Sequence, residues 1–172
     1  MRKKGMYRVA VIVAAVAIAF FSGCAKDSSD DSFDILDQTL QGQFDGKSFS
    51  LVSGYAEDEY FSPTDCEVEL FNVAPASGLS PWDIGAYPSG SGYLEVGFSV
   101  PQAVGTYKLS LGPQTATLYD PANDHLNIIC DEGSIRIDSI SGGYITGAIA
   151  ARQSDDHDQY VNGNFSVPIK PY

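Results

Sequence analysis

The stretch Ser141-Gly142-Gly143-Tyr144-Ile145-Thr146-Gly147-Ala148-Ile149-Ala150-Ala151 decides the fold. Its glycine pair predicts a turn, and every second residue after the turn falls on one stripe: Ile145, Gly147, Ile149 and Ala151. Alternation of this kind is typical of a β-strand with one buried face. After an acidic loop, the same period returns in a last stripe: Val161, Gly163, Phe165, Val167 and Ile169.

The period of two extends back to Thr39. It predicts strands within residues 40–44, 48–55, 66–73, 94–100, 106–111, 115–119 and 125–130, and around 135–137. Asp45-Gly46 is a strong hairpin-turn dipeptide, and no window of the mature domain holds three turns of helical spacing. Roughly nine or ten short strands with frequent turn signals predict an all-β fold, an antiparallel β-sandwich or alternatively a small β-barrel.

Alternation also assigns the two faces of each strand. The residues expected to point inward in two central runs are Leu94, Val96, Phe98, Val100, Tyr107, Leu109 and Leu111. Those expected to face water include Glu67, Glu69, Tyr93, Glu95 and Ser99. A short similarity between residues 41–44 and 162–165, Gln-Gly-Gln-Phe and Asn-Gly-Asn-Phe, suggests that the first and last strands are neighbours.

The amino terminus has the anatomy of an export signal. Four basic residues precede or open an uncharged apolar run of thirteen residues, Val9 to Phe21. As a helix this run spans about 20 Å, which is less than the roughly 20 residues that a bilayer crossing needs. A basic start, a short apolar middle and small residues before a cut site are typical of a secretory signal peptide.

Ser22-Gly23-Cys24 makes this segment resemble the signal of bacterial lipoproteins, in which the cysteine after the cut carries lipid. The resemblance implies a signal peptide at 1–23, acylation of Cys24 and a lipidated acidic tether at 24–37, followed by the β-domain at 38–172. Because no aspartate directly follows Cys24, the enterobacterial sorting scheme implies the outer membrane. Whether the domain faces the periplasm or the cell surface stays open.

The charge of the chain excludes some partners. Removing the signal takes away four of the ten basic residues and none of the 22 acidic ones, so the net charge falls from −12 to −16. Nucleic acid and anionic lipid headgroups favour basic surfaces. The membrane is therefore expected as a partner only through the anchor, and nucleic acid is not expected.

Two cysteines, Cys66 and Cys130, remain when Cys24 is assigned to lipid. In an exported protein they form one candidate disulfide. Alternation points both sulfurs inward, since Cys66 shares a face with Val68 and Cys130 shares one with Ile128. The alternative is a pair of buried thiols.

The domain also resembles small uncharacterised bacterial lipoproteins whose mature part is one β-domain. The resemblance rests on three stretches: residues 100–109, 133–137 and 161–167. It implies a fold and no activity. The order Cys66, Trp82, Cys130 is that of immunoglobulin domains, but Trp82 lies in Ser80-Pro81-Trp82-Asp83 rather than in a strand.

Signatures of catalysis are missing from the sequence. His125 and His157 are isolated, and no zinc-protease helix, phosphate loop or nucleophile elbow is found. The protein is therefore expected not to be an enzyme and to need no cofactor. Carboxylate pairs of the kind that hydrolyse glycosides are separated in sequence, so a glycan-acting hydrolase stays an alternative.

Residues 154–159 place Asp155, Asp156 and Asp158 beside His157. Loops rich in carboxylates suit Ca²⁺, which makes these three the weak candidates for a metal site and makes a calcium-stabilised adhesion module a second hypothesis. Asp120 and Asp124 form a weaker pair. A solvated hairpin tip is the alternative for the acidic loop.

The long connection from Pro75 to Gly92 contains Trp82 and Tyr87, and Tyr93 follows it. Aromatic side chains on a rigid β-scaffold bind sugar rings or anchor a protein partner. These three residues are the candidate binding loop. The expected function is that of a lipid-anchored, non-catalytic envelope protein that binds a polysaccharide or another envelope protein. The alternative is that Trp82 caps one end of the core.

Overall fold

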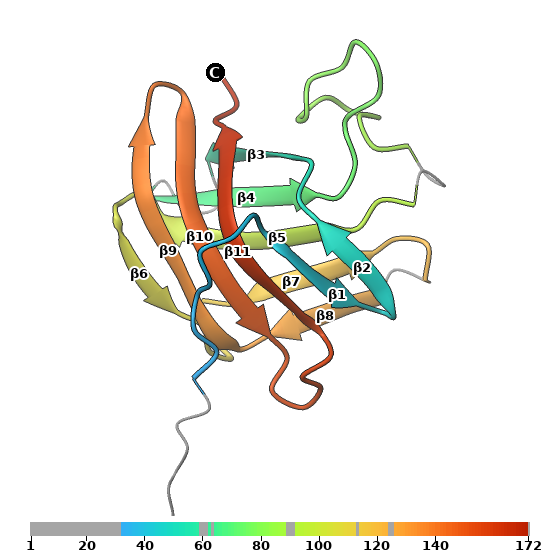
Figure 1. The fold of residues 1–172 in the computed structure, drawn as a ribbon. Helices are drawn as coiled ribbons and strands as arrows, with labels where there is room; N and C mark the ends of the chain where they lie inside the picture. Colours follow the sequence, from blue (N-terminus) through green and yellow to red (C-terminus); the bar gives the residue numbers. More distant parts are fainter. Residues whose placement is uncertain are drawn as a thin grey trace, which may run out of the picture. The chain divides into compact units, whose positions relative to one another are not determined.

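The computed structural model describes residues 32–58, 62, 64–88, 92–112, 114–123 and 126–171. These residues form two antiparallel sheets packed face to face, which confirms the predicted β-sandwich (Figure 1). The sheets do not close into the small barrel considered as the alternative. The expected signal peptide at 1–23, Cys24 and the tether up to residue 31 lie outside the described residues.

Six strands form one sheet in the order β2-β1-β11-β10-β9-β6. Their bounds are β1 Gln41–Phe44, β2 Lys47–Ser50, β6 Gly105–Lys108, β9 Glu132–Ser141, β10 Tyr144–Arg152 and β11 Tyr160–Pro168. The other sheet has the order β3-β4-β5-β7-β8. Its strands are β3 Ser53–Asp58, β4 Asp65–Phe71, β5 Glu95–Pro101, β7 Ala116–Asp120 and β8 Leu126–Cys130.

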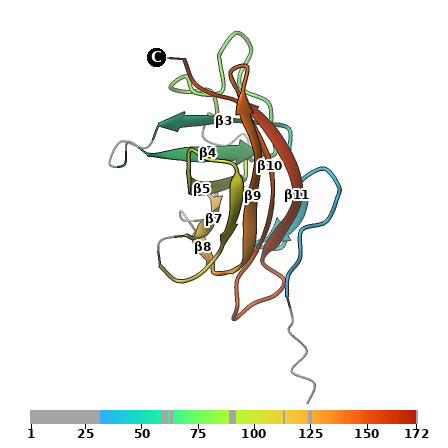
Figure 2. The same cartoon turned by 90° about the vertical axis from the view of Figure 1, so that its left-hand side faces the viewer.

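The strands of the two sheets cross steeply, with β9, β10 and β11 running over β4 and β5 in Figure 1. Figure 2 shows the two layers edge on. The core lies between them and is built from the inward side of the predicted alternation; Phe98 of β5 meets Phe165 of β11 edge to face at 5.6 Å between ring centroids. Each sheet keeps an outer face, and the outer face of the five-stranded sheet carries the candidate site.

The predicted strand at 48–55 is two strands that belong to different sheets. Leu51 donates its backbone N–H to Leu40 and stays with β1, whereas Val52 donates to Phe71 and joins β4. The chain therefore passes from one sheet to the other between two consecutive residues. A change of sheet keeps the extended backbone and the period of two, so alternation does not reveal it, and the structure has eleven strands among the described residues.

Two local predictions are confirmed. Asp45 and Gly46 both have positive φ, at 51° and 67°, as a two-residue hairpin turn requires. The first and last strands are neighbours, because β1 pairs antiparallel with β11 through Gln41 and Asn162.

The chain enters the domain along β11. Leu36 donates its N–H to Asn162 Oδ1 at 2.8 Å, and Asn162 Nδ2 donates to the carbonyl oxygen of Asp34 at 2.8 Å. The compact unit accordingly begins at Ser32, within the stretch expected as tether. Gly163 allows this close passage, because a Cβ there would lie 2.7 Å from the Gln38 carbonyl oxygen and its φ is +138°.

No disulfide bond joins Cys66 and Cys130, so the predicted pairing is wrong. Both side chains are buried as expected, but they lie on β4 and β8, which are three strand steps or about 14 Å apart. Cys130 is opposite Ala116, and that row continues through Phe98 to Val68, two residues from Cys66. A disulfide needs Cα atoms within about 7 Å. Alternation gave the correct face but says nothing about the order of strands.

Leu111 is a second correction, since it is 78 % exposed although alternation placed it inside. The strand β6 ends at Lys108, so the period of two no longer applies three residues later. Leu109 is buried as expected.

Candidate binding groove

The outer face of the five-stranded sheet carries acidic and aromatic side chains around a glycine. Gly97 of β5 lies opposite Glu69 of β4 and Thr117 of β7. Glu95, two residues earlier on β5, shares this face. Among the described atoms, a Cβ built on Gly97 would meet only the Glu95 carboxylate, at 3.8 Å. The missing side chain leaves the middle of the face open.

Two open hollows cover this face and share Glu95, and we call them together the acidic groove. The first has a volume of about 420 Å³, and its lining includes Glu67, Glu95, Gly97, Ser99, Thr117 and Tyr119. The second has a volume of about 290 Å³, and its lining includes Tyr55, Glu69, Trp82, Tyr87, Tyr93 and Glu95. The second hollow therefore lies between the sheet and the β4–β5 connection.

The β4–β5 connection forms a fixed aromatic wall. The Tyr87 ring stacks on Phe71 of β4 with 3.8 Å between centroids, and its hydroxyl lies 2.9 Å from Ser53 Oγ of β3. Within the loop, the Ser80 N–H donates to the Asp83 carboxylate at 2.6 Å. The contacts of Tyr87 tie the connection to β3 and β4, so this aromatic ring is held in place before any ligand arrives.

All three residues of the predicted binding loop line the second hollow. Tyr93 lies 5.9 Å from Tyr87 between ring centroids, and Trp82 is partly exposed. Trp82 does not belong to the buried core cluster of the described residues. This placement favours a role in the groove over the alternative that Trp82 caps the core.

The groove contains carboxyl groups that burial keeps from ionising easily. Burial, reinforced by Glu69 and Glu67, raises the pKa of Glu95 to about 7. Burial also raises the pKa of Glu69, although the hydrogen bond from Tyr55 opposes the rise. Burial and the bond to Glu69 raise the pKa of Tyr55 in turn. Within the described residues, no lysine, arginine or histidine forms an ion pair with Glu95.

Glu69, Glu95 and Tyr55 are the groove residues that sequence reasoning missed. Alternation placed the two glutamates on the water-facing side, where a charge needs no explanation. Pairing brings them together: Glu69 lies opposite Tyr55 on β3 and opposite Gly97 on β5, which makes it a diagonal neighbour of Glu95, about 7–8 Å away between Cα atoms. The signal in the sequence was the aromatic loop that joins their two strands.

The weak metal candidates lie at the exposed tip of the β10–β11 hairpin. Asp156 accepts hydrogen bonds from the Asp158 N–H at 3.1 Å and from Gln159 Nε2 at 3.0 Å, and the bond from Gln159 lowers the pKa of Asp156. Asp155 and Asp158 are exposed. Within the described residues, no group of three or more His, Cys, Asp or Glu is arranged to hold a metal ion. His125 and Asp124 lie outside the described residues.

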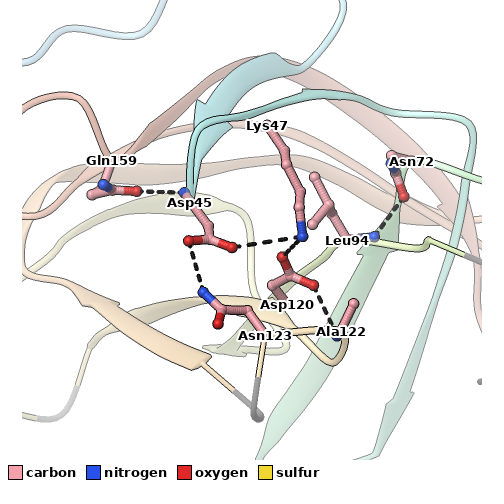
Figure 3. A network of polar contacts seen from close by, with 8 residues as sticks. All are labelled: Asp45, Lys47, Asn72, Leu94, Asp120, Ala122, Asn123 and Gln159. Atoms are coloured by element: carbon pink, nitrogen blue, oxygen red, sulfur yellow. Dashed lines mark hydrogen bonds and ion pairs between the residues drawn. The ribbon is translucent and has the colours of Figure 1, made fainter. Parts of the chain in front are cut away.

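Asp120, the other acidic candidate, belongs to a structural network (Figure 3). Lys47 donates to its carboxylate, and the Ala122 N–H donates to it at 2.9 Å. Asn123 Nδ2 donates to Asp45 at 2.8 Å, next to Lys47. The network joins the β1–β2 hairpin of one sheet to the β7–β8 turn of the other. The carboxylate of Asp120 already accepts hydrogen bonds from Lys47 and Ala122, which indicates a structural role.

No family model, no curated protein and no solved structure matches this chain. In the part of the chain that the structure describes, no helix has the length and apolarity to cross a membrane.

Proposed function

We propose that this protein is a lipid-anchored, non-catalytic envelope protein that binds a polysaccharide through the acidic groove. The observation that supports this is the convergence of Trp82, Tyr87 and Tyr93 in one open hollow beside Glu69 and Glu95. Flat aromatic faces are suited to stacking against sugar rings. Ionised carboxylates accept hydrogen bonds from sugar hydroxyls, and an open groove leaves room for a chain to continue on both sides.

The anchor is the second part of the proposal, with Cys24 as the lipidated residue and the outer membrane as the location. It is supported by the resemblance of residues 1–24 to lipoprotein signals. The described chain starts at Ser32 against β11, in the six-stranded sheet. The acidic groove lies on the outer face of the other sheet, so the entering chain does not compete with a ligand for the same surface.

Binding is tested with the full chain purified in detergent and a panel of immobilised polysaccharides. Trp82→Ala should weaken retention by about tenfold or more, since stacking against an aromatic ring is lost. Tyr144→Ala is the matched control, because Tyr144 is an exposed aromatic on the six-stranded sheet, 51 % exposed. Equal loss in both variants would contradict a specific role for the groove.

An envelope protein as the partner is the other outcome of this test. A protein ligand would be captured from envelope extract by the wild type and lost with Trp82→Ala, with no retention on any polysaccharide. That result would keep the groove as the site and replace the class of ligand.

Hydrolysis of the glycan is the alternative that Glu95 favours. A carboxyl group with a pKa of about 7 keeps its proton near neutral pH, as a general acid must, and Glu69 lies on the neighbouring strand. Release of reducing ends from a bound glycan, abolished by both Glu95→Gln and Glu69→Gln, would overturn the non-catalytic proposal.

The anchor is tested in bacteria fed an alkyne analogue of palmitate. The wild type should take up the label and partition with the outer membrane, and Cys24→Ser should do neither. Protease added to intact cells then distinguishes the two sides: digestion places the domain on the surface, whereas protection until lysis places it in the periplasm.

A further inference from the structure

The charged side chains in the described lining of the acidic groove are all acidic. Its described lining contains Glu67, Glu69, Glu95 and Asp83, and it contains no lysine or arginine. The described cation whose charge acts on Glu69 is Lys170, which is itself paired with Glu57. A glycan bearing carboxylate, sulfate or phosphate groups would therefore be repelled from this surface.

A neutral glycan would bring no cation to the desolvated carboxylates of Glu69 and Glu95, and burying a carboxylate without a charge partner costs free energy. A ligand that brings a positive charge removes that cost, because an ammonium group donates charge-assisted hydrogen bonds to carboxylates. The aromatic wall acts in the same direction, since cations are attracted to the faces of Trp and Tyr rings. Trp82, Tyr87 and Tyr93 stand beside Glu69 and Glu95 in the same hollow.

We propose that the acidic groove selects glycans with unacetylated amino sugars, whose ammonium groups lie between the carboxylates of Glu69 and Glu95 and the aromatic wall. This inference rests on the proposed function and specifies its ligand class. The aromatic faces would stack on the sugar rings, while the carboxylates would accept charge-assisted hydrogen bonds from the ammonium group at the amino position. N-acetylation removes that charge and adds bulk, so it should abolish the preference.

Binding of the cation should also release a proton. The described titratable groups around Glu95 come from every element packed against it: Glu67 and Glu69 from β4, Asp83 and Tyr87 from the β4–β5 connection, Tyr93 before β5, Tyr119 from β7 and, farther away on β3, Tyr55. None of them carries a positive charge that could hold the Glu95 carboxylate ionised in the free protein. At a pH at which the amino groups of the free glycan are already protonated, an ammonium group at this place lowers the pKa of Glu95, and the proton of Glu95 leaves for the buffer.

The test is isothermal titration of the full chain in detergent with three oligosaccharides that share a β-1,4 backbone: glucosamine hexamer, N-acetylglucosamine hexamer and cellohexaose. The glucosamine hexamer should bind about tenfold or more tightly than the other two, and the difference should shrink as salt is added. Glu95→Gln should remove the preference and the proton release, measured as a heat that depends on the ionisation enthalpy of the buffer. Asp155→Asn, an exposed carboxylate on the β10–β11 tip, is the control and should change neither.

The outcomes separate the two proposals. Equal affinity for all three oligosaccharides, lost with Trp82→Ala, would overturn the amino-sugar inference and leave polysaccharide binding intact. Tighter binding of the acetylated or neutral hexamer would overturn it as well. Binding of none of the three, or of a lysine-rich peptide alone, would overturn the inference, and failure on the full polysaccharide panel would also remove the proposed function.

Discussion

Asp120 and Glu95 are two carboxylates of the five-stranded sheet whose pKa values shift in opposite directions. Asp120 is 1 % exposed, and burial works against its charge, yet hydrogen bonds from Lys47 and Ala122 outweigh burial and lower the pKa of Asp120. Glu95 on the outer face is also desolvated, but its carboxyl neighbours Glu69 and Glu67 add to the effect, and the pKa of Glu95 rises to about 7.

This difference in pKa shift distinguishes a carboxylate that stabilises the fold from one in the candidate binding site. A buried carboxylate whose hydrogen bonds come from its own chain holds the fold together, as Asp120 does between the two sheets (Figure 3). A desolvated carboxylate without a cation beside it costs stability, and groups with strongly shifted pKa values are frequent at functional sites. In the described domain, the acidic groove is the place where a cationic ligand would provide the positive charge that the described residues do not place beside Glu95.

The largest effect is expected when the compensated side is broken. Asp120→Asn removes the charge that holds Lys47 while keeping the shape of the side chain, so the domain should lose about 2 kcal/mol of unfolding free energy. Chemical denaturation measures this loss. Glu95→Gln is the counterpart in the acidic groove and should cause no loss of unfolding free energy. Comparable destabilisation by both variants would contradict the distinction between a structural and a groove carboxylate.

The pH dependence of stability should differ in sign between the two carboxylates. Glu95 has an ordinary pKa of 4.5 and a folded value of about 7, so its contribution is most favourable below 4.5 and is lost as the pH rises to about 7. Asp120 has a lowered pKa, so its contribution is present above its ordinary value of 3.8 and is lost as the pH falls through the folded value.

Denaturation midpoints between pH 4.5 and 7 test this sign. Glu95→Gln should become more stable relative to the wild type as the pH rises through this window, because the glutamine cannot ionise. A constant difference between the two proteins across the window would show that Glu95 ionises normally.

A smaller effect is expected from the aromatic wall. Trp82→Ala should change the unfolding free energy by about 0.5 kcal/mol or less, as is usual for positions outside the core, because Trp82 is outside the buried cluster. Thermal unfolding, with Phe98→Ala as the core reference, measures this. A loss for Trp82→Ala that approaches the roughly 3–5 kcal/mol expected of a core aromatic would assign it to the scaffold instead.

The smallest effect should come from reductant. Since Cys66 and Cys130 are not joined by a disulfide, dithiothreitol should leave the denaturation midpoint unchanged. Burial raises the pKa of Cys130 to about 12, so this thiol should react with maleimide only after unfolding. A marked fall of the midpoint on reduction would mean that a covalent link, rather than the packing described, holds β4 and β8.

The sequence predicted the parts of this molecule that depend on local period. Alternation identified the strands and their inward faces, and Asp45-Gly46 marked its hairpin. Strand order is a long-range property, so the crossing at Leu51 and Val52 and the separation of Cys66 from Cys130 could not be predicted. The same holds for the candidate site: its local features could be predicted from the sequence, and those that depend on strand order could not.

Trp82, Tyr87 and Tyr93 were found because aromatic residues in a glycine- and proline-rich loop stand out. Glu69 and Glu95 were not found because each is an ordinary outward glutamate until β4 and β5 are placed side by side. Only that pairing, which places Gly97 opposite Glu69, makes the two glutamates diagonal neighbours on one desolvated face.

Titration of the full chain with glucosamine hexamer shows directly whether the acidic groove binds an amino-sugar glycan. We expect binding that Trp82→Ala and Glu95→Gln each weaken by about tenfold, while Tyr144→Ala and Asp155→Asn leave it unchanged. Binding that survives both groove substitutions would place the ligand elsewhere on the molecule, and the groove would not be the binding site.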